Sequence, residues 1–395
     1  MRNVMIVDGG VSFGGSVVVA ARLANNLARF GYKPVVVSSI KTQLITHHFS
    51  EQVKLVYLKR YISYADRGKL DGVVERRGEV LKKISMYLFS LAEWLSNAVY
   101  AVHLLRIIKK ENVKIIHANN NMEPIWLSIL LRIPCVWHFH GFADPGDKLK
   151  RFFIRRCKKH ISISNSVTRS INDSLYLDQD TLITLYNPLG DSEGYTHADL
   201  LRLKADLRIG EQQKVIGVFG RLVPWKGQKQ FLEAFKIVVA NCPDTVALIV
   251  GDDSEYGGFH SKLKALAERL EIDKNVVFCG YVHETSKYYQ ICDVVVHSSI
   301  SPEPFGLVIT EAMHNRVPVI ASSLGAGVEL IKPYETGILV NPYEAEAMSD
   351  AICNVLQDEE LRKSLVANGY KYVIEMMDPI LYASNISKYC YDPLN

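Results

Sequence analysis

Two glutamates lie at a spacing that suits ligand binding in the stretch 301–313. Two prolines and a glycine interrupt regular structure within residues 301–306, so this part is predicted to be a loop. The apolar residues that follow recur at helical spacing. Glu303 is therefore expected on the loop and Glu311 one to two turns into the helix. The two carboxylates could accept hydrogen bonds from hydroxyl groups at both ends of one ligand.

Groups that could hold a phosphate accompany these glutamates. The predicted helix opens with the backbone amides of Phe305, Gly306 and Leu307, and a helix N-terminus attracts phosphate. A second loop, residues 220–227, carries Arg221 and Lys226 after a predicted strand. Arginine offers a planar fork to phosphate oxygens and lysine a mobile point charge. Together these groups predict a diphosphate site. The alternative interpretation of residues 301–313 is a plain loop-to-helix junction with one solvated glutamate.

Strands that alternate with helices must position these groups. Short apolar runs predict strands at 4–7, 35–37, 113–117, 135–140, 161–164, 182–186, 215–219, 247–250, 276–278, 294–297, 317–321 and 337–340. Alternation with helices favours an α/β fold with parallel sheets, arranged as two Rossmann-like halves. A polar break after Asn187-Pro188 places the boundary near residue 190. The predicted domains are 1–190 and 191–375, with a helix in 376–395 that crosses back to the first domain.

A glycine-containing loop follows the first predicted strand. Gly14 and Gly15 lie just before a helix that runs to about Phe30. The loop lacks a full dinucleotide fingerprint, so a nicotinamide site is weakly supported. Close approach of the backbone to a ligand and simple tight turning both explain the two glycines.

Composition narrows the class of protein. The chain has 395 residues, which favours two domains. Its seven cysteines are scattered without metal-ligand spacing, which predicts reduced thiols in the cytosol. No signal peptide is expected, because the chain enters a strand at once. The apolar run 86–105 is interrupted by polar residues, so a buried or interfacial helix is expected there rather than a membrane span.

Positive charge is concentrated in the first half. Residues 1–190 hold 27 Lys and Arg against 14 Asp and Glu, an excess of 13 positive charges, whereas the remainder has a negative excess of 9. The segment Lys148–Lys159 is basic with aromatic residues interleaved. At helical pitch its cations Lys148, Arg151, Arg155 and Lys159 would share one side, with Phe152 nearby. This pattern predicts docking to an anionic membrane surface, with a solvated helix as the alternative; no nucleic-acid module accompanies it.

These motifs resemble one family of enzymes. The segment Gly220-Arg-Leu-Val-Pro-Trp-Lys-Gly227, together with Pro302-Glu-Pro-Phe-Gly and the later Glu311-Ala-Met313, is similar to the retaining nucleotide-sugar glycosyltransferases of family 4. Their fold, GT-B, implies two Rossmann-like domains whose parallel sheets face each other across a cleft. The chain departs from the pattern at Asn187-Pro188 and at Gly325-Ala326-Gly327, where glycine after Asn and adjacent glycines are usual.

The resemblance implies a role for each matching residue. Arg221 and Lys226 would hold the donor diphosphate, and Glu311 the ribose hydroxyls. Glu303 would contact the transferred sugar. The remaining donor contacts would come from Gly14, Gly15, Tyr281, Val282, Phe305, Gly306 and Leu307. His140 would lie near the donor sugar and acceptor, whereas His138 is expected on the other side of the strand, in the core.

The resemblance and the charges together imply a mechanism. Negative charge grows on the leaving diphosphate, where Arg221, Lys226 and the helix N-terminus would stabilise it. No enzymatic nucleophile is obvious, so front-face transfer is expected, with the leaving phosphate helping to deprotonate the acceptor. No metal and no cofactor are expected, and Asp178-Gln179-Asp180 is interpreted as a turn.

The sequence therefore predicts a cytosolic, metal-independent, retaining hexosyltransferase. Its donor would be a UDP- or GDP-hexose and its acceptor a lipid-linked or cell-envelope glycan. Two alternatives remain open. One is a soluble sugar-phosphate synthase or phosphorylase of the same fold, and the other is a nucleotide-sugar-binding protein without turnover.

Overall fold

The structure is a computed structural model that describes residues 2–10, 14–41, 43, 45–62, 79–119, 121–144, 148–190, 194–254 and 257–394. Within these residues the chain forms two compact units. Unit 1 comprises residues 1–163, 167–188 and 379–395, and unit 2 comprises 164–166 and 189–378. The change of unit after residue 188 lies beside the predicted linker at 190. The C-terminal segment from Pro379 belongs to unit 1.

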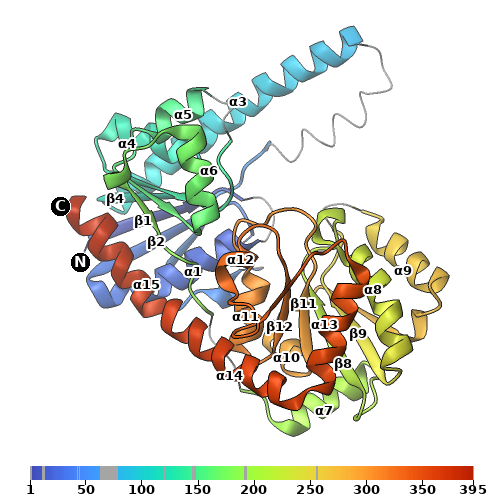
Figure 1. Cartoon of the computed structure of the whole chain (residues 1–395). Coiled ribbons are helices and arrows are strands. Elements are labelled where there is room, and N and C mark those ends of the chain that lie inside the picture. Colours follow the sequence, from blue (N-terminus) through green and yellow to red (C-terminus); the bar gives the residue numbers. More distant parts are fainter. Residues whose placement is uncertain are drawn as a thin grey trace. The chain divides into compact units, whose positions relative to one another are not determined.

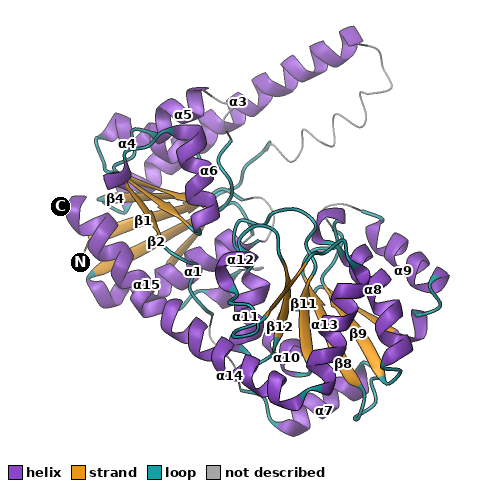
Figure 2. Ribbon diagram, viewed as in Figure 1, coloured by secondary structure: helices purple, strands orange, loops and turns teal. Residues whose placement is uncertain are grey.

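Unit 1 is a parallel α/β sheet with helices (Figures 1 and 2). Its strand order is β3-β2-β1-β4-β5-β6-β7. The strands are β1 (Arg2–Asp8), β2 (Tyr32–Ser38), β3 (Lys54–Tyr57), β4 (Ile115–Asn119), β5 (Cys135–Phe139), β6 (Lys159–Ser162) and β7 (Leu182–Thr184). The helices are α1 (Gly15–Leu27), α3 (Glu79–Lys110), α4 (Glu123–Leu131), α5 (Lys148–Ile154), α6 (Asn165–Leu175) and α15 (Pro379–Ile386).

Unit 2 repeats this plan with the strand order β10-β9-β8-β11-β12-β13. Its strands are β8 (Lys214–Phe219), β9 (Thr245–Val250), β10 (Val276–Gly280), β11 (Val294–His297), β12 (Val319–Ser322) and β13 (Ile338–Val340). Its helices are α7 (His197–Asp206), α8 (Gln228–Asn241), α9 (Phe259–Arg269), α10 (Thr285–Gln290), α11 (Leu307–His314), α12 (Gly327–Leu330), α13 (Ala345–Gln357) and α14 (Glu359–Met376). The predicted α/β fold with two parallel sheets is confirmed.

Strand β3 is absent from the sequence prediction. It pairs only with β2 at the edge of the sheet, and its residues are half-buried or exposed. Such an edge strand lacks the continuous apolar run by which the central strands are identified.

The C-terminal segment completes the core of unit 1. Helix α15 packs against α1, and Tyr382, Ile386 and Tyr391 are buried among the residues of that core. The Tyr32 hydroxyl donates to an Asp392 carboxylate oxygen at 2.6 Å. These contacts hold the last turns of the chain on the first sheet.

The basic segment differs from its prediction. Helix α5 ends at Ile154, and Lys159 already begins strand β6. Lys159 Nζ donates to the carbonyl of Asp180 at 2.9 Å, and Arg155 Nε donates to that of Leu175 at 2.9 Å. The prediction that Lys148, Arg151, Arg155 and Lys159 share one side of a helix is therefore wrong. The helical pattern does not continue to Lys159, because Ile154 is buried at the end of α5 and Lys159 pairs with β5 as the first residue of β6.

Candidate active site

The phosphate-binding candidates lie where the order of the second sheet reverses. Strands β8 and β11 are neighbours at the centre of that sheet, and the chain leaves them toward opposite edges. Loops at the carboxyl ends of two such strands form the usual ligand crevice of an open α/β sheet. Arg221 and Lys226 follow β8, and Glu303 follows β11.

Close packing of backbone ties these two loops together. Gly227 has φ +73°, and a Cβ there would lie 1.9 Å from the carbonyl oxygen of Ser298. Ser298 Oγ donates to the carbonyl of Lys226 at 3.0 Å, and the Ile300 amide donates to that of Trp225 at 2.9 Å. Only glycine permits this approach, which brings Lys226 beside the loop that carries Glu303.

Glu303 lies at the centre of a buried polar cluster and is 5 % exposed. One carboxylate oxygen, Oε1, pairs with Lys226 Nζ and accepts from Ser299 Oγ at 2.8 Å. The other, Oε2, lies 3.2 Å from His297 Nε2. The cation of Lys226 lies in turn over the Trp225 ring, 4.6 Å from its centroid.

These neighbours keep Glu303 ionised. Burial alone would raise the pKa of its carboxyl group, but the charges and hydrogen bonds of His297 and Lys226 outweigh burial and hold the pKa well below its usual range. A buried carboxylate in a fixed position can stabilise positive charge that develops nearby.

The turn around Gly325 supports the Glu303 loop from the side. Gly325 has φ +68°, and a Cβ there would lie 2.3 Å from the amide nitrogen of Glu303. The Ala326 amide donates to the Glu303 carbonyl at 3.0 Å. A single glycine at 325 thus suffices for the close approach, although the sequence departs from the family's paired glycines here.

Helix α11 begins directly behind this loop. Gly306 precedes it with φ +92° and makes no side-chain cap, and Phe305 is 3 % exposed. Glu311 lies in the second turn and accepts from the Tyr289 hydroxyl at 3.3 Å. Glu311 therefore lies on the helix, and the Tyr289 hydroxyl holds one of its carboxylate oxygens.

The other donor-site candidates lie at the ends of the same sheet. Arg221 is exposed, and its carbonyl accepts from Gln228 Nε2 at 2.9 Å. Tyr281 and Val282 follow β10, and the Tyr281 ring is 47 % exposed and meets His283 edge to face. The structure brings Lys226 and Glu303 together.

Buried polar residues also lie at the carboxyl edge of the sheet in unit 1. Asp8, Asn119 and His138 are in register at the ends of β1, β4 and β5, and all three are buried. Asp8 accepts from Ser16 Oγ at 3.2 Å. Burial raises the pKa of Asp8 to about 6, although its hydrogen bonds to Ser16 and to the Gly10 backbone oppose the increase.

The structure bears on why glycine occupies position 14. Gly14 precedes α1 with an extended φ of −161°, a conformation open to any residue. A Cβ there would meet none of the described residues within 4 Å. The turn itself therefore does not require a glycine at this position. Gly15 is exposed and is the first residue of α1.

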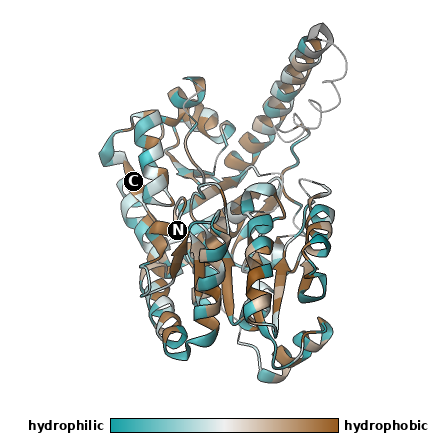
Figure 3. Ribbon diagram, turned by 45° about the vertical axis from the view of Figure 1, so that its right-hand side comes forward, coloured by the Kyte–Doolittle hydropathy of each residue, from teal (hydrophilic) through white to brown (hydrophobic). Residues whose placement is uncertain are grey.

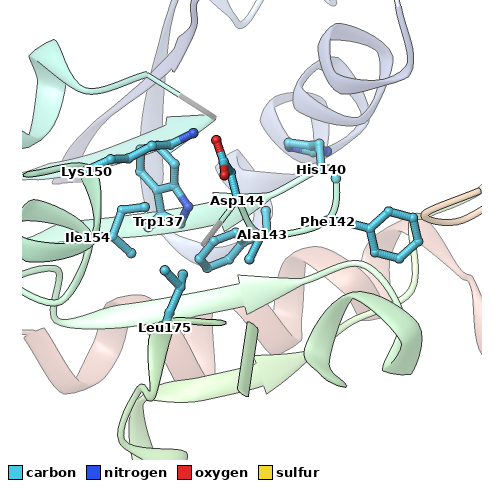
Figure 4. A pocket seen from close by; sticks show the side chains of 10 residues that line it. Trp137, His140, Phe142, Ala143, Asp144, Lys150, Ile154 and Leu175 are labelled. Carbon is cyan, nitrogen blue, oxygen red and sulfur yellow. The ribbon is translucent and has the colours of Figure 1, made fainter. Parts of the chain in front are cut away.

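His140 lines a cavity of about 240 Å³ within unit 1 (Figure 4). The aromatic side chains in this cavity are Trp137, Phe139 and Phe142, and its charged ones are Asp144 and Lys150. Trp137 is 1 % exposed, and its indole nitrogen has no hydrogen-bond partner among the described residues. A lining that combines aromatic rings with charged groups fits a hydroxyl-rich ligand.

The prediction that His138 faces away from His140 is wrong. Their rings lie 4.0 Å apart between centroids, because residues i and i+2 of a strand point to the same face. His138 is nevertheless buried, as predicted, and its Nδ1 lies 3.1 Å from His117 Nε2. His117 Nδ1 lies 2.7 Å from the Tyr391 hydroxyl. Burial lowers the pKa of all three histidines.

The segment 178–180 forms a turn. Its last residues are part of a 3₁₀ helix, Gln179–Thr181, and the Asp178 carboxylate caps it by accepting from the Asp180 amide at 3.1 Å. Within the described ranges no group of three or more His, Cys, Asp or Glu side chains is arranged to hold a metal ion.

Sequence reasoning missed two residues of the Glu303 cluster, His297 and Ser299. His297 ends strand β11 and looks like a core residue from its apolar neighbours. A signal was present, however: polar residues occupy the last position of a buried strand and the two that follow it, 297–299, at the edge where α/β sheets bind ligands.

Comparisons with known proteins agree with this architecture. The model of the family described as Glycosyltransferase Family 4 matches residues 13–190, and that described as Glycosyl transferases group 1 matches residues 201–372. The fold and the matched domains define a two-domain glycosyltransferase of the GT-B class. Within that class, the chain belongs to glycosyltransferase family 4.

Two curated relatives have different acceptors in their names. An N-acetyl-alpha-D-glucosaminyl L-malate synthase of Bacillus anthracis is 25 % identical over 307 residues, covering 74 % of this chain and 78 % of the relative. A lipopolysaccharide core mannosyltransferase, LpsB, of Rhizobium meliloti is 26 % identical over 275 residues, covering 68 % and 76 %.

Solved structures show the same fold. A glycosyltransferase of Rickettsia africae has a TM-score of 0.80 at 21 % identity and covers 98 % of this chain and 97 % of its own. HepE of Anabaena, solved with UDP and glucose, has a TM-score of 0.78 at 20 % identity and covers 99 % and 100 %.

Proposed function

We propose that this glycosyltransferase moves a hexose from a UDP- or GDP-linked donor to a hydroxyl group of a lipid-linked or cell-envelope glycan, with retention of configuration and without a metal. The observation that carries the proposal is the cluster of Lys226, Glu303 and His297 at the switch point of the second sheet. Such a cluster offers both a cation and a fixed carboxylate where a nucleotide sugar would bind.

Each contact to the donor is proposed from the position of the residue in the fold. Arg221 is exposed at the end of β8 and would bind the diphosphate together with Lys226 and the first amides of α11, at Phe305, Gly306 and Leu307. Glu311 would accept from the ribose hydroxyls, and the backbone at Tyr281 and Val282 would contact the base. Gly14 and Gly15 would admit donor phosphate near their backbone.

The charges of the cluster suit a dissociating donor. As the bond from sugar to phosphate breaks, positive charge grows on the sugar, and the ionised Glu303 would stabilise it. Lys226 and Arg221 would stabilise the negative charge on the leaving diphosphate. The leaving phosphate would take the proton of the acceptor hydroxyl as that oxygen attacks the same face, which retains the configuration.

The cavity beside His140 is the proposed acceptor site. The exposed Phe142 offers an aromatic surface to a sugar, and Asp144 and Lys150 line the same cavity with polar groups. The half-buried ring of His140 stays neutral because desolvation lowers its pKa, so it can exchange hydrogen bonds with a hydroxyl group. His140 would thus hold the acceptor rather than supply a charge.

A small anionic acceptor is the second candidate, in the manner of the malate named for the Bacillus anthracis relative. Lys150 in the same cavity favours it, since a lysine attracts a carboxylate or phosphate. We further propose a cytoplasmic location, with reversible attachment to an anionic membrane if the acceptor is lipid-linked.

A donor screen tests the proposal. UDP, GDP and their hexose derivatives are added one at a time, and the melting temperature is followed. A true ligand at about 100 times its Kd adds about 2.7 kcal/mol to the stability of the fold. The stabilising donor is then incubated with glycan, lipid-linked and dicarboxylic acceptors in EDTA, and the anomeric configuration is read by NMR.

If none of the nucleotides raises the melting temperature, the proposed donor site is contradicted. A product with inverted anomeric configuration would contradict retention. Activity that is lost in EDTA and restored by a divalent ion would contradict metal independence.

A further inference from the structure

Helix α3 carries an apolar stripe on its exposed side. From Lys83 onward, eight large apolar side chains of this helix are exposed, at Ile84, Tyr87, Leu88, Leu91, Trp94, Leu95, Val99 and Val102. Six of them, namely Ile84, Leu88, Leu91, Leu95, Val99 and Val102, recur every three or four residues and therefore lie along one side. We call the eight residues the α3 stripe. Helix α3 extends beyond the rest of unit 1, and hydrophobic residues recur along it (Figures 1 and 3).

The other side of the same helix belongs to the protein. Ser96, Tyr100, Leu104 and Ile108 are buried at four-residue spacing, and α3 packs against α4. Next to them Asn97 accepts from Arg60, whose guanidinium also pairs with Glu123 at 2.9 Å. These contacts fix one end of the helix, so the orientation of the stripe on unit 1 is determined by its packing.

Cations bracket the stripe at both ends. Lys83 precedes it and is exposed, and on the far side the same helical spacing continues to Arg106 and Lys110, which are exposed as well. Between Lys83 and Arg106 the only charged residue is Glu93. The stripe from Ile84 to Val102 is about 27 Å long at 1.5 Å per residue.

Either a second copy of this chain or an anionic bilayer would cover the α3 stripe, and the charges at the ends of the stripe distinguish between them. In a second copy of this chain, a parallel helix would place Lys83 against Lys83, and an antiparallel one would place it against Arg106. Like charges meet in both cases, which disfavours association. An anionic bilayer instead offers phosphate groups to both ends at once, and tyrosine and tryptophan side chains such as Tyr87 and Trp94 favour the interface.

By length and composition alone, Lys83–Lys110 could also cross a membrane, and it is the one such helix in the described part of the chain. Packing opposes that arrangement. The buried side from Ser96 to Ile108 is held on α4, and Glu93 lies midway along the apolar run. A helix with one protein-facing side and one apolar side lies in the interface rather than across it.

We propose that the α3 stripe docks this protein on an anionic membrane surface, with its apolar side chains in the acyl boundary and Lys83, Arg106 and Lys110 on the headgroups. The proposal deepens the membrane attachment in the proposed function, but vesicle binding can be measured without any donor or acceptor. Failure of one is therefore distinguishable from failure of the other.

Flotation with the full chain tests the proposal, with neutral phosphatidylcholine vesicles and vesicles that contain phosphatidylglycerol. Binding is expected to rise with phosphatidylglycerol and to fall between 0.1 and 0.5 M salt, as a charge-dependent contact does. The double variant Leu91→Glu/Leu95→Glu should reduce the partition coefficient at least tenfold. Ser90→Glu is the matched control, because it adds a charge at an exposed position of the same helix on a different side from Leu91 and Leu95. It should lower the partition coefficient far less than the double variant does.

Tryptophan quenching locates the contact. Brominated lipids should quench the original protein more than Trp94→Phe, because Trp94 is exposed on the stripe whereas Trp137 is buried. Equal binding of the double variant would overturn the proposal, as would loss of binding in Arg155→Glu alone, which would assign the contact to the region of α5. A dimer in light scattering that the double variant converts to a monomer would show that a second copy covers the stripe. Nucleotide stabilisation should be unchanged in every α3 variant.

Discussion

Glu303 is a fixed negative charge because three neighbours compensate for its burial. Lys226, Ser299 and His297 occupy both of its oxygens. A side chain held in this way is preorganised, since it need not move or lose solvent when positive charge develops beside it.

Replacing Glu303 by Gln should therefore slow turnover on the order of 10²-fold, as loss of one preorganised electrostatic group does. The affinity for the bare nucleoside diphosphate should change little, because Glu303 is expected to act on the sugar. Steady-state rates and calorimetric titration with the diphosphate give the two quantities. Full turnover combined with weaker binding of the diphosphate would assign Glu303 to the phosphates instead.

Arg221 and Lys226 should respond differently to removal. Arg221 is exposed, so Arg221→Ala should weaken diphosphate binding by about 1.5–3 kcal/mol without lowering the melting temperature. Lys226 pairs with the buried Glu303, so Lys226→Ala should also destabilise unit 2, because it leaves a buried carboxylate with less compensation. Titration calorimetry and thermal unfolding measure both effects.

The exposed Lys229, which pairs with Glu233 on α8, supplies the matched control. Lys229→Ala removes one positive charge outside the loop and should affect neither measurement. Unchanged affinity in both Arg221→Ala and Lys226→Ala would place the diphosphate elsewhere.

At the scale of elements, glycines at two positions allow three loops to meet. Gly227 brings the β8 loop to Ser298, and Gly325 brings the turn after β12 to Glu303. The site thus depends on backbone approach between loops, not only on the charged side chains that they carry.

Gly325→Ala should disable the site. Its Cβ would lie 2.3 Å from the Glu303 amide and must displace that loop. Gly257→Ala is a matched control, since Gly257 has a similar φ of +65° but none of the described residues lies within 4 Å of its Cβ position. The control should lose only the roughly 1–2 kcal/mol of left-handed backbone strain. Thermal unfolding and transfer rates compare the two, and equal losses would show that φ alone matters.

At the scale of the whole molecule, the two units should differ in acid stability. Burial lowers the pKa of His117 to about 3 and that of His138 as well. Their unfolded pKa is about 6.5, so below that pH the unfolded chain binds more protons and unit 1 loses stability. Asp8 acts oppositely as pH falls from about 6, because its pKa is raised, and it offsets only part of the loss.

Unit 2 instead depends on Glu303, whose pKa is lowered. Its contribution persists above the usual pKa of a glutamate, 4.5, and is lost only below it. Acid unfolding monitored by hydrogen exchange should therefore open unit 1 between pH 6.5 and 4.5 while unit 2 stays protected. Simultaneous opening of both units, or earlier opening of unit 2, would contradict this order.

Local residue patterns were enough to predict the fold class and the motifs. Apolar runs predicted the central strands because these strands are buried on both faces, and Gly306 and Lys226 stood out because prolines, glycines and charges interrupt such runs. The positions of these residues at strand ends then followed from the rule that parallel sheets bind ligands at their carboxyl edge. The roles given to Arg221, Glu311 and Tyr281 remain predictions.

Which side chains meet depends on packing between distant parts of the chain. His297 lies in the apolar run of β11, and its contact with Glu303 depends on how a later loop folds back. The end of α5 at Ile154 depends on pairing between β5 and β6, which helical spacing cannot reveal. The exposure of the α3 stripe likewise follows from which side of that helix packs on α4. Local pattern fixes what each element is, whereas contacts between residues distant in the sequence fix what each side chain touches.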